Sequence, residues 1–517
     1  MIQPQAAVVA NPFSRSRATF DAMCERLQGS DAFAMTHAGV ERMLATDGKE
    51  ILRQLFQDHL DLRGAHEQVA PLSSVTGEDG LERPHHRNAT RDLKSLVGEV
   101  VVPRIGYGQR GTTSRFPMDA ALNLPQDPFS LGVRYVVALA CASNSFEASV
   151  ESVEATTGVH VAKRQAEALA QAAALDFDGY YNQRAAPAPS NVSSLLVLSS
   201  DGKGIVVRVQ DLRPATRKAR LARTPRLKTR LAKGEKKYAK RMAMVTTVYS
   251  VAPHIRTPDD ILADLLHESP PEKRRRPHAE QKRTWATIEK ESDEAIAKLF
   301  DEAERRDPQR VRRWVVVVDG NKDQLALIKA EAARRGISIT IVIDFIHVLH
   351  YLWAASTAFH SEASAEREEW VLSRLRDVLG GKAVDVAAGM RRSATLRRLG
   401  TTARRAVDKC ADYLLDYKAH LHYDQYLRDG LPIASGVIEG ACRHLVNDRL
   451  GITGAHWSLL GAEAILKLRA LRSSGDLQDY WAFHESCEYE RNHAARYLGS
   501  VPLPHAPRPR PSLRLVK

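Results

Sequence analysis

The sequence predicts a mixed α/β protein, in which one core of strands and helices is combined with helical regions before, within and after it. Strand-like segments rich in Val and Ile are concentrated between residues 191 and 350. Most segments outside that stretch show apolar residues at helical spacing. Hydrophobic residues make up 44% of the 517 positions, which is typical of globular proteins and sufficient for about three or four structural units.

The N-terminal region, residues 1–95, is predicted to be mostly helical. Residues 20–27 and 50–60 carry apolar side chains at helical spacing. Residues 71–91 are rich in charge, Ser, Pro and His, and we expect them to form a loop. A short strand and a basic, Gly-containing turn are expected over residues 97–111.

A helix-turn-helix-like DNA-binding region is predicted for residues 96–190. A helix is expected from Ser145, Gly158 breaks its pattern, and a further helix restarts the pattern. The start of that helix would present Lys163 and Arg164 outward, as the recognition helix of such a motif does. An ordinary helical hairpin is the alternative interpretation.

Residues 191–350 are predicted to form the catalytic core. Strands are expected over residues 195–202, 204–210, 242–251, 312–320 and 337–344, and helices over 281–304 and 323–335. Three hairpin-like strands followed by α-β-α-β is the order of a ribonuclease-H-like domain with a mixed sheet. Its continuous Val/Ile strands would be buried on both faces.

The remainder of the chain shows no strand patterns. Residues 351–430 are predicted to be an all-helical insertion, and residues 431–495 a C-terminal helical part of the core. The tail, residues 496–517, is rich in Pro and Arg and is expected to be disordered and basic.

Three carboxylates are candidate metal ligands and catalytic residues. Asp201 and Asp319 each follow a strongly apolar strand, and Glu439 lies in the helical segment SGVIEGACRHLVNDRL. Mg²⁺ prefers oxygen ligands, and two such ions can hold the attacking and leaving oxygens of a phosphodiester displacement. The alternatives are ordinary Asp-Gly turns and an ion pair of Glu439 with Arg443 four residues later.

A fourth acidic residue extends this set. Asp344 ends the last predicted strand, and His347 lies three residues later on the same helix face. Either side chain could contact a metal ion directly. We interpret them instead as residues that support the metal ligands, with Asp344 capping the following helix.

The net charge of +13 is concentrated in one segment. Residues 211–241 contain thirteen Lys and Arg against two acids, which is a net charge of +11. A second basic run occupies residues 273–276. Both are expected to be loops leaving the catalytic sheet, where they would contact DNA phosphates without reading sequence.

Several other classes of protein are excluded. The sequence has no run of 18 apolar residues, so we expect no membrane span. The first residues lack a long apolar stretch followed by a cleavage site, so secretion is not expected. The five cysteines form no CxxC pair, which argues against a disulfide framework and a zinc ribbon and fits a reducing cytosol.

Together these motifs resemble bacterial insertion-sequence transposases of the DDE class, and the ISKra-type family in particular. The motifs are DGKG near Asp201, VVVVDGNKDQL, VIDFIHVLHYLW and SGVIEGACRHLVNDRLGITGAHWS. The resemblance covers roughly residues 95–485. It implies that Asp201, Asp319 and Glu439 form the catalytic triad around two Mg²⁺ ions, with Mn²⁺ as a possible substitute.

The resemblance also implies the partners. The protein would bind the ends of its transposon and target DNA, both double-stranded, as a homodimer or larger assembly. The residues assigned to DNA contact are Lys163, Arg164, Arg217, Lys218, Arg220, Arg223, Lys236, Lys237, Arg443, His456 and Trp457. For His456 and Trp457, the alternative to DNA contact is a capped turn with a buried indole. Many family members carry a CxxC-type pair near residues 105–112, but this chain does not, so no structural zinc is predicted.

Three other functions fit part of this pattern. A different ribonuclease-H-like nuclease would use the same triad but would not need a helical insertion or a separate DNA-reading region. A regulator derived from a transposase would have lost at least one of the three carboxylates. A metal-independent helical scaffold protein is the third possibility.

Overall fold

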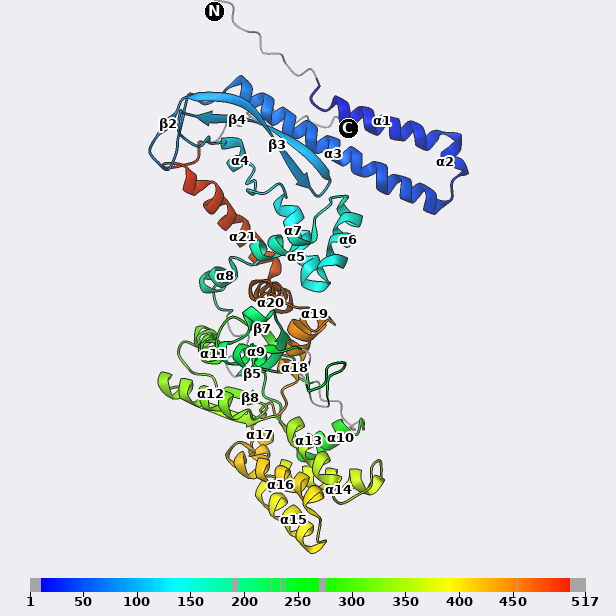
Figure 1. Cartoon of the computed structure of the whole chain (residues 1–517), viewed down its shortest axis with the longest axis vertical. Helices are drawn as coiled ribbons and strands as arrows, with labels where there is room; N and C mark the ends of the chain where they lie inside the picture. The colour runs from blue at the N-terminus through cyan, green and yellow to red at the C-terminus, as the bar shows by residue number, and fades with distance from the viewer. Residues whose placement is uncertain are drawn as a thin grey trace, which may run out of the picture. The chain divides into compact units, whose positions relative to one another are not determined.

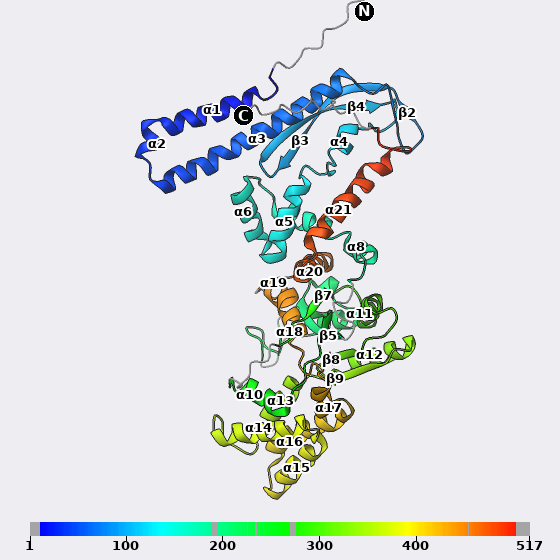
Figure 2. The same cartoon turned by 180° about the vertical axis from the view of Figure 1, so that it is seen from behind.

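The computed structural model describes residues 11–187, 194–224, 226–232, 235–236, 238–268, 276–452 and 454–502. The chain divides into two compact units (Figures 1 and 2). Unit 1 comprises Met1–Asn182 and Leu477–Lys517, and unit 2 comprises Gln183–Asp476. Part of the tail that we expect to be disordered, residues 503–517, lies outside the described residues.

Unit 1 contains long helices, one β-hairpin and a group of shorter helices. Its elements are α1 (Ser14–Gln28), α2 (Ser30–Ala34), α3 (His37–Val69), β1 (Val75–Thr76), β2 (Glu82–Arg83), β3 (His85–Ser95), β4 (Gly98–Gly108), α4 (Pro117–Ala121), α5 (Leu131–Ser143), α6 (Phe146–Thr157), α7 (Lys163–Ala173), α8 (Phe177–Gln183) and α21 (Leu477–Asn492). The helical prediction is confirmed for residues 14–69, whereas residues 1–10 lie outside the described residues.

The hairpin of β3 and β4 corrects the prediction for residues 71–95, which we expected to be loop and helix. All eleven residues of β3 pair antiparallel with β4. Most β3 side chains are polar, so the strand has little hydrophobic pattern of its own. Its partner supplies the apolar contacts, because Val100 and Val102 pack with Leu93 and with Leu60 of α3 in one core cluster.

Three helices of unit 1 form the predicted helix-turn-helix outline. Ser145 caps α6 by accepting a hydrogen bond from the backbone N–H of Ala148. Gly158 ends α6 with a φ of 75°, a left-handed conformation that favours glycine. α5 packs against both α6 and α7. The order and limits of these helices agree with the sequence pattern.

Unit 2 contains the sheet and the remaining helices. Its elements are β5 (Leu195–Val206), η1 (Val209–Asp211), α9 (Pro214–Leu221), β6 (Lys240–Val251), α10 (Pro258–Leu265), β7 (Glu280–Thr287), α11 (Ser292–Arg306), β8 (Trp314–Val318), α12 (Lys322–Arg335), β9 (Ile339–Ile343), α13 (Phe345–Ser356), α14 (Ala365–Leu379), α15 (Ala383–Leu396), α16 (Thr401–Asp416), η2 (Lys418–His420), α17 (Tyr423–Arg428), α18 (Gly436–Ala441), the π-helical segment η3 (Cys442–Asn447), α19 (Asp448–Leu450) and α20 (Leu459–Ser474).

The five strands of unit 2 form one mixed sheet in the order β7-β6-β5-β8-β9. β7, β6 and β5 are antiparallel neighbours, whereas β5, β8 and β9 are parallel. Every residue of β8 is buried. Both views show α11 and α12 on one side of the sheet and α18 and α19 on the other (Figures 1 and 2). The continuous apolar strands are therefore covered on both faces.

Two strands differ from the sequence prediction. β5 runs without a turn through Asp201, so the two strands expected over residues 195–202 and 204–210 are one. β7 and the start of α11 replace the single helix expected over residues 281–304. Both errors have one cause: each segment is extended because it pairs with β6, a partner distant in sequence. Three strands followed by α-β-α-β are observed, but the three strands are β5, β6 and β7 rather than the three segments that we predicted.

The insertion predicted over residues 351–430 is all-helical, as expected. It contains the end of α13, then α14, α15, α16, η2 and α17. α16 packs against both α13 and α15. Beyond it, α18 and α20 lie in unit 2, whereas α21 belongs to unit 1.

Candidate metal and nucleic-acid site

Three aspartates occupy one row across neighbouring strands of unit 2. Continuing the parallel registers of β5 with β8 and of β8 with β9 brings Asp201 beside Asp319, and Asp319 beside Asp344. Neighbouring strands lie about 4.8 Å apart, so the three side chains start from adjacent points of the sheet. The expectation that Asp201 ends its strand is wrong, because β5 continues to Val206. The parallel register, rather than a strand end, places Asp201 beside Asp319.

Glu439 joins this row from α18. Asp201, Asp319 and Glu439 line one cavity of about 190 Å³. The other residues that line it are Ser200, Lys203, His347, His350, Ser435 and Ile438. Glu439 is exposed, and the two aspartates are half-buried. The three carboxylates that the sequence singled out therefore line the same cavity, although more than a hundred residues separate each from the next.

Ser435 connects α18 to the end of β9. It occupies the predicted N-cap position, but its side chain makes no capping hydrogen bond to the helix backbone. Its hydroxyl instead lies within hydrogen-bonding distance of Asp344 and 3.3 Å from Oε1 of Glu439. This serine therefore orients two acidic side chains from separate segments.

Asp344, His347 and Glu439 form a group that could hold a metal ion. One ligand atom from each lies within 4.8 Å of the others. Asp344 is fully buried and caps α13, accepting a hydrogen bond of 2.9 Å from the backbone N–H of Ile346. Its other oxygen lies 3.4 Å from Nδ1 of His347. The capping role expected for Asp344 is confirmed. The same carboxylate also contacts His347 through its second oxygen.

The cavity carries more negative than positive charge. Among the lining residues, which are all described, Lys203 is the only Lys or Arg, and its Nζ lies 2.8 Å from Asp201. Partial burial lowers the pKa of Lys203, but the hydrogen bond and the charge of Asp201 outweigh it and raise that pKa. The hydrogen bond of Asp344 raises the pKa of His347 above 6.5, against partial burial, and the charges of Asp344, Asp319 and Glu439 add to the rise.

Cys442 is a member of this site that the sequence did not reveal. Its buried thiol donates a hydrogen bond to Asp201 Oδ2 over 3.3 Å. Burial and the neighbouring Asp201 raise the pKa of the thiol well above its usual value, so it stays protonated and acts as a donor. No spacing rule links a lone cysteine to an aspartate 241 residues away.

Four tyrosines of α16 and α17 hold the backbone next to the acidic residues. Their hydroxyls donate to main-chain carbonyls: Tyr413 to Asp319 over 3.0 Å, Tyr417 to Gly320, Tyr423 to Ile343 over 2.7 Å and Tyr426 to Ile341 over 3.2 Å. Burial raises the pKa of all four hydroxyls, which keeps them as donors. The helical insertion is thus anchored to the strand ends that carry Asp319 and Asp344.

The helix that carries Glu439 continues as the π-helical segment η3. Such segments often occur at functional sites. The alternative that Glu439 pairs with Arg443 is wrong, because Nε of Arg443 lies 3.7 Å from Asp448. Arg443 is exposed.

The basic segment, residues 211–241, is partly helical rather than a simple loop, because α9 forms within it. Arg217, Lys218 and Lys236 are exposed. Arg220 and Arg223 are half-buried, and Arg223 donates to the carbonyl of Lys236 over 2.7 Å. Lys237 and residues 273–275 lie outside the described residues.

Two arginines fix the ends of the basic segment to the turn that follows β7. Arg213 pairs with Glu291 and donates to the carbonyl of Lys290 over 2.7 Å. Arg241 donates to the carbonyl of Ile288 over 2.7 Å. These two cations stabilise the fold, so the charge of the segment that is accessible to DNA is smaller than its net +11.

In the segment GAHWS, Trp457 and His456 differ in exposure, so the DNA-contact role and the buried-indole alternative do not apply equally to both. Trp457 is buried, its indole N–H donates to the carbonyl of Leu450 over 3.3 Å, and the Arg449 guanidinium lies 4.7 Å from the centre of its ring. Trp457 is therefore the buried indole of the alternative interpretation. His456 is exposed, with its ring centre 4.1 Å from that of Tyr238 in the basic segment.

In unit 1, Lys163 and Arg164 are exposed at the start of α7. Nζ of Lys163 lies 3.9 Å from Glu147 of α6, a weak surface pair. Their position at the start of the second helix is the one that the motif predicts for residues that reach DNA.

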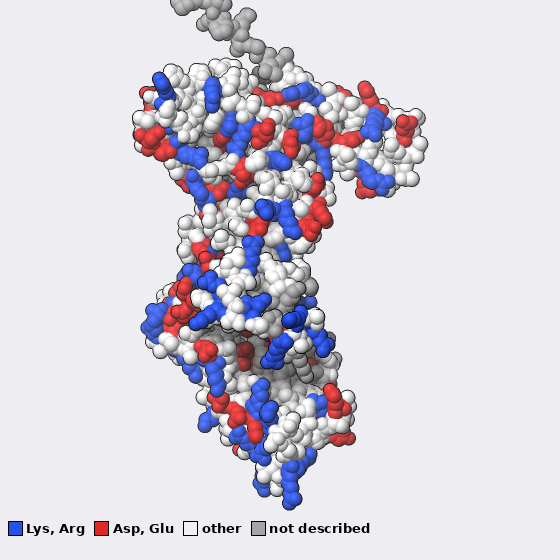
Figure 3. Space-filling view, in the orientation of Figure 1, with Lys and Arg blue, Asp and Glu red and all other residues white. Residues whose placement is uncertain are grey.

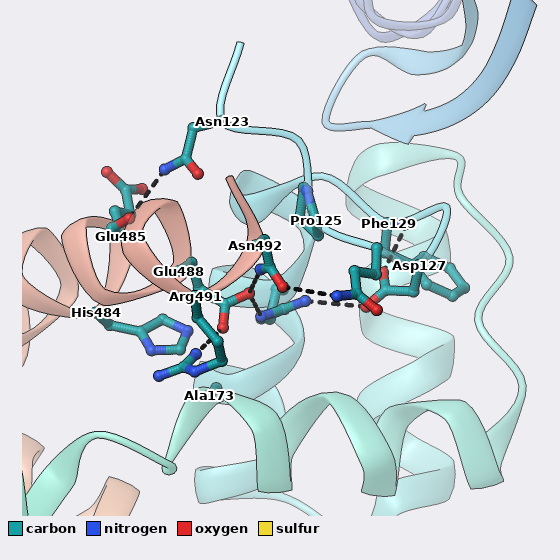
Figure 4. Close-up of polar contacts among 12 residues, drawn as sticks. Asn123, Pro125, Asp127, Phe129, Ala173, His484, Glu485, Glu488, Arg491 and Asn492 are labelled. Carbon is teal, nitrogen blue, oxygen red and sulfur yellow. Dashed lines mark hydrogen bonds and ion pairs between the residues drawn. The ribbon is translucent and has the colours of Figure 1, made fainter. Parts of the chain in front are cut away.

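A second group of carboxylates and histidine, the α21 cluster, lies in unit 1 and was not predicted. It consists of Asp176, His484 and Glu488, with ligand atoms within 4.8 Å of one another. Figure 4 shows His484, Glu488 and Arg491 projecting from α21. Arg491 contacts both carboxylates, at 2.5 Å for Asp176, and Arg134 donates to Glu488 over 2.7 Å. Because arginines already neutralise its carboxylates, this cluster fits a structural role better than metal binding.

Comparisons with known proteins add no assignment: no protein-family model matches the chain, and no curated protein is significantly similar to it. In the part of the chain that the structure describes, every helix is too short or too polar to cross a membrane.

Proposed function

We propose that the protein is a DNA transposase of an insertion sequence, which cleaves and joins DNA strands with Asp201, Asp319 and Glu439. One observation carries the proposal. These three carboxylates come from β5, from the end of β8 and from α18, and they line a single cavity beside the central strand. Such convergence of carboxylates at a sheet is the arrangement that metal-dependent phosphodiester chemistry requires.

The sheet supports a ribonuclease-H-like core. Its first strand, β5, is central, the next two strands pair antiparallel on one side, and the last two add in parallel on the other. The predicted core has three strands followed by α-β-α-β along the chain, which agrees with this sheet. The all-helical insertion between Asp344 and Glu439 agrees with the resemblance to ISKra-type transposases.

The donor set fits a hard divalent cation. Carboxylate oxygens from Asp201, Asp319 and Glu439 would hold it, and the excess of negative charge in the cavity favours it. When bound there, Mg²⁺ or Mn²⁺ would supply positive charge to the attacked phosphate. Ser435 and Asp344 orient Glu439 and His347, which fixes the geometry around those ligands.

The reaction would proceed in two displacements. A water oxygen attacks the phosphorus at the transposon end, the bond from phosphorus to the 3′-oxygen breaks, and that oxygen takes up a proton. The freed 3′-hydroxyl then attacks a target phosphodiester, whose own bond to a 3′-oxygen breaks. Neither step needs a covalent bond to the protein.

DNA would contact two surfaces in this proposal. The exposed cations of residues 211–241 would bind phosphates near the cavity. Arg443 and His456 are exposed close to Glu439 in sequence and would add to that surface. Lys163 and Arg164 at the start of α7 would read the transposon ends.

The test is a cleavage and strand-transfer assay with Mg²⁺ and a labelled duplex that carries the inverted repeats flanking the gene. Asp201→Asn, Asp319→Asn and Glu439→Gln should each reduce both reactions to background and leave DNA binding intact. Asp323→Asn is the matched control, because this exposed carboxylate lies outside the cavity. Cleavage without joining would favour another ribonuclease-H-like nuclease. DNA binding without either reaction would favour a regulator.

A further inference from the structure

A second basic surface lies where α15 ends and α16 begins. Residues 391–409 contain seven Lys and Arg against one Asp, a net charge of +6. In Figure 3, Lys and Arg side chains gather at the lower end of the molecule, over the region that Figure 1 labels α15 and α16. The net charges of residues 211–241 (+11) and of residues 391–409 (+6) together exceed the net charge of the whole chain (+13).

Part of this charge stabilises the insertion. Arg391 of α15 lies 2.5 Å from Asp412 of α16 and joins the two helices. Nε of Arg404 lies 3.4 Å from Asp408 within α16. Arg397 donates to the carbonyl of Phe359 over 3.2 Å. These arginines have partners within the fold and need no external ligand.

Three other arginines have no such partner. Arg392, Arg398 and Arg405 are exposed, and within the described residues their side chains make no hydrogen bond or ion pair. Three exposed cations elsewhere in the insertion do have carboxylate partners: Arg376 with Asp259, Lys382 with Asp377 and Arg428 with Asp424. The unpaired arginines are therefore confined to one end of the insertion.

Arg398 also occupies an unusual backbone conformation. Its φ is +50°, in the left-handed region that glycine and asparagine favour. An arginine there costs about 1 kcal/mol. This conformation ends α15, because it lets the backbone N–H of Leu399 donate to the carbonyl of Ala394 over 3.1 Å. The side chain of Arg398 makes no hydrogen bond or ion pair with a described residue.

We propose that Arg392, Arg398 and Arg405 form a phosphate-binding surface for the DNA duplex that flanks the cleaved bond. This inference rests on the proposed function for the identity of the DNA. Like charges that face only solvent repel one another, whereas duplex DNA offers about one negative charge per 1.7 Å along its axis. Guanidinium groups bind phosphate oxygens in bidentate geometry.

The helix α16 sets the distance between this surface and the cavity. Arg405 lies near its start, and Tyr417, which donates to the carbonyl of Gly320 beside Asp319, follows its end. Twelve residues of helix span about 18 Å. That length corresponds to about five base pairs, so the contacted phosphates would lie about five base pairs or slightly more from the cleaved bond.

Salt dependence of DNA binding tests this surface. The probe is a fluorescent 30-base-pair duplex of random sequence, because phosphate contacts do not depend on sequence. Its affinity for the full chain is measured by anisotropy at several salt concentrations. The variant R392Q/R398Q/R405Q should bind more weakly, and its slope of log affinity against log salt should fall by about 2 to 3.

The matched control is R376Q/K382Q/R428Q. It removes the same charge from exposed positions at or near the insertion, but these cations already have carboxylate partners. Its slope should change by less than about 1. Thermal unfolding of both variants should match the wild type, because exposed side chains of this kind change stability by at most about 0.5 kcal/mol.

The outcomes separate this inference from the proposed function. Equal changes in both variants, or an unchanged slope in R392Q/R398Q/R405Q, would overturn the surface even if the wild type cleaves DNA. A wild type that binds the duplex but neither cleaves nor joins DNA would overturn the proposed function. In that case the phosphate-binding surface would still be supported if the slope of log affinity against log salt falls in R392Q/R398Q/R405Q and not in the control. A wild type that binds no duplex at all would overturn both.

Discussion

The cavity of unit 2 and the α21 cluster of unit 1 contain the same residue types but differ in their cations. Asp344, His347 and Glu439 lie near Asp201 and Asp319, and Lys203 is the only cation of the cavity lining. In the α21 cluster, Arg134 and Arg491 contact the carboxylates directly. Charge compensation therefore distinguishes the proposed metal site from a cluster whose carboxylates are already neutralised by arginines.

The largest expected effect concerns the α21 cluster. Glu488→Gln would remove a buried carboxylate that both Arg134 and Arg491 contact, and among the described residues Asp127 would be the only carboxylate left beside Arg134. We expect a loss of about 3 kcal/mol in the free energy of unfolding of unit 1. Denaturant unfolding followed by circular dichroism measures it. Glu490→Gln is the control, because Glu490 is exposed on the same helix. An equal effect of both substitutions would remove the structural distinction between the clusters.

The second prediction uses metal binding. At a concentration 100 times its dissociation constant, Mn²⁺ should stabilise the wild type by about 2.7 kcal/mol, measured as a rise in melting temperature. Glu439→Gln and Asp319→Asn should abolish most of that rise because each removes a ligand. Glu488→Gln should retain it, although its melting temperature without metal is lower. A rise lost only in Glu488→Gln would place the ion in unit 1.

The third prediction concerns the tyrosine contacts of α16. Tyr417→Phe would leave the carbonyl of Gly320 without its donor and cost about 1 kcal/mol of stability. We expect Mn²⁺ affinity to fall about tenfold, because second-sphere contacts typically have that effect. The control is Tyr351→Phe, whose ring stacks on Tyr413 at 4.1 Å but whose hydroxyl makes no hydrogen bond within the described residues. An unchanged affinity would limit Tyr417 to a structural role.

The sequence located the acidic residues of the cavity better than their surroundings. Asp319 follows a run of four valines, and Asp344 follows another apolar strand, so local pattern sufficed for both. Cys442, the Ser435 hydroxyl and the four tyrosines were not predicted as parts of the site. Their hydrogen bonds reach residues far away in the chain, and no local periodicity encodes such contacts. For the same reason β7, which pairs with a distant strand, resembled a helix.

The smallest expected effect is the protonation of His347. Asp344 raises the pKa of His347 by a hydrogen bond, so Asp344→Asn should lower that pKa toward 6.5, measured by NMR titration. Asparagine also caps helices, so α13 should remain intact. Asp323→Asn should leave the titration unchanged.

A raised pKa in the folded state means that His347 contributes stability below pH 6.5, and that this contribution is lost as the pH rises through the raised value. Mg²⁺ bound by Asp319 and Glu439 would cancel the negative charges that favour the protonated ring. Saturating Mg²⁺ should therefore lower the pKa of His347 and move the loss of stability to lower pH, whereas the NMR signals of His484 should not respond to Mg²⁺. A response of His484 equal to that of His347 would show that the arginines of unit 1 do not exclude the ion, and the distinction between the two clusters would fail.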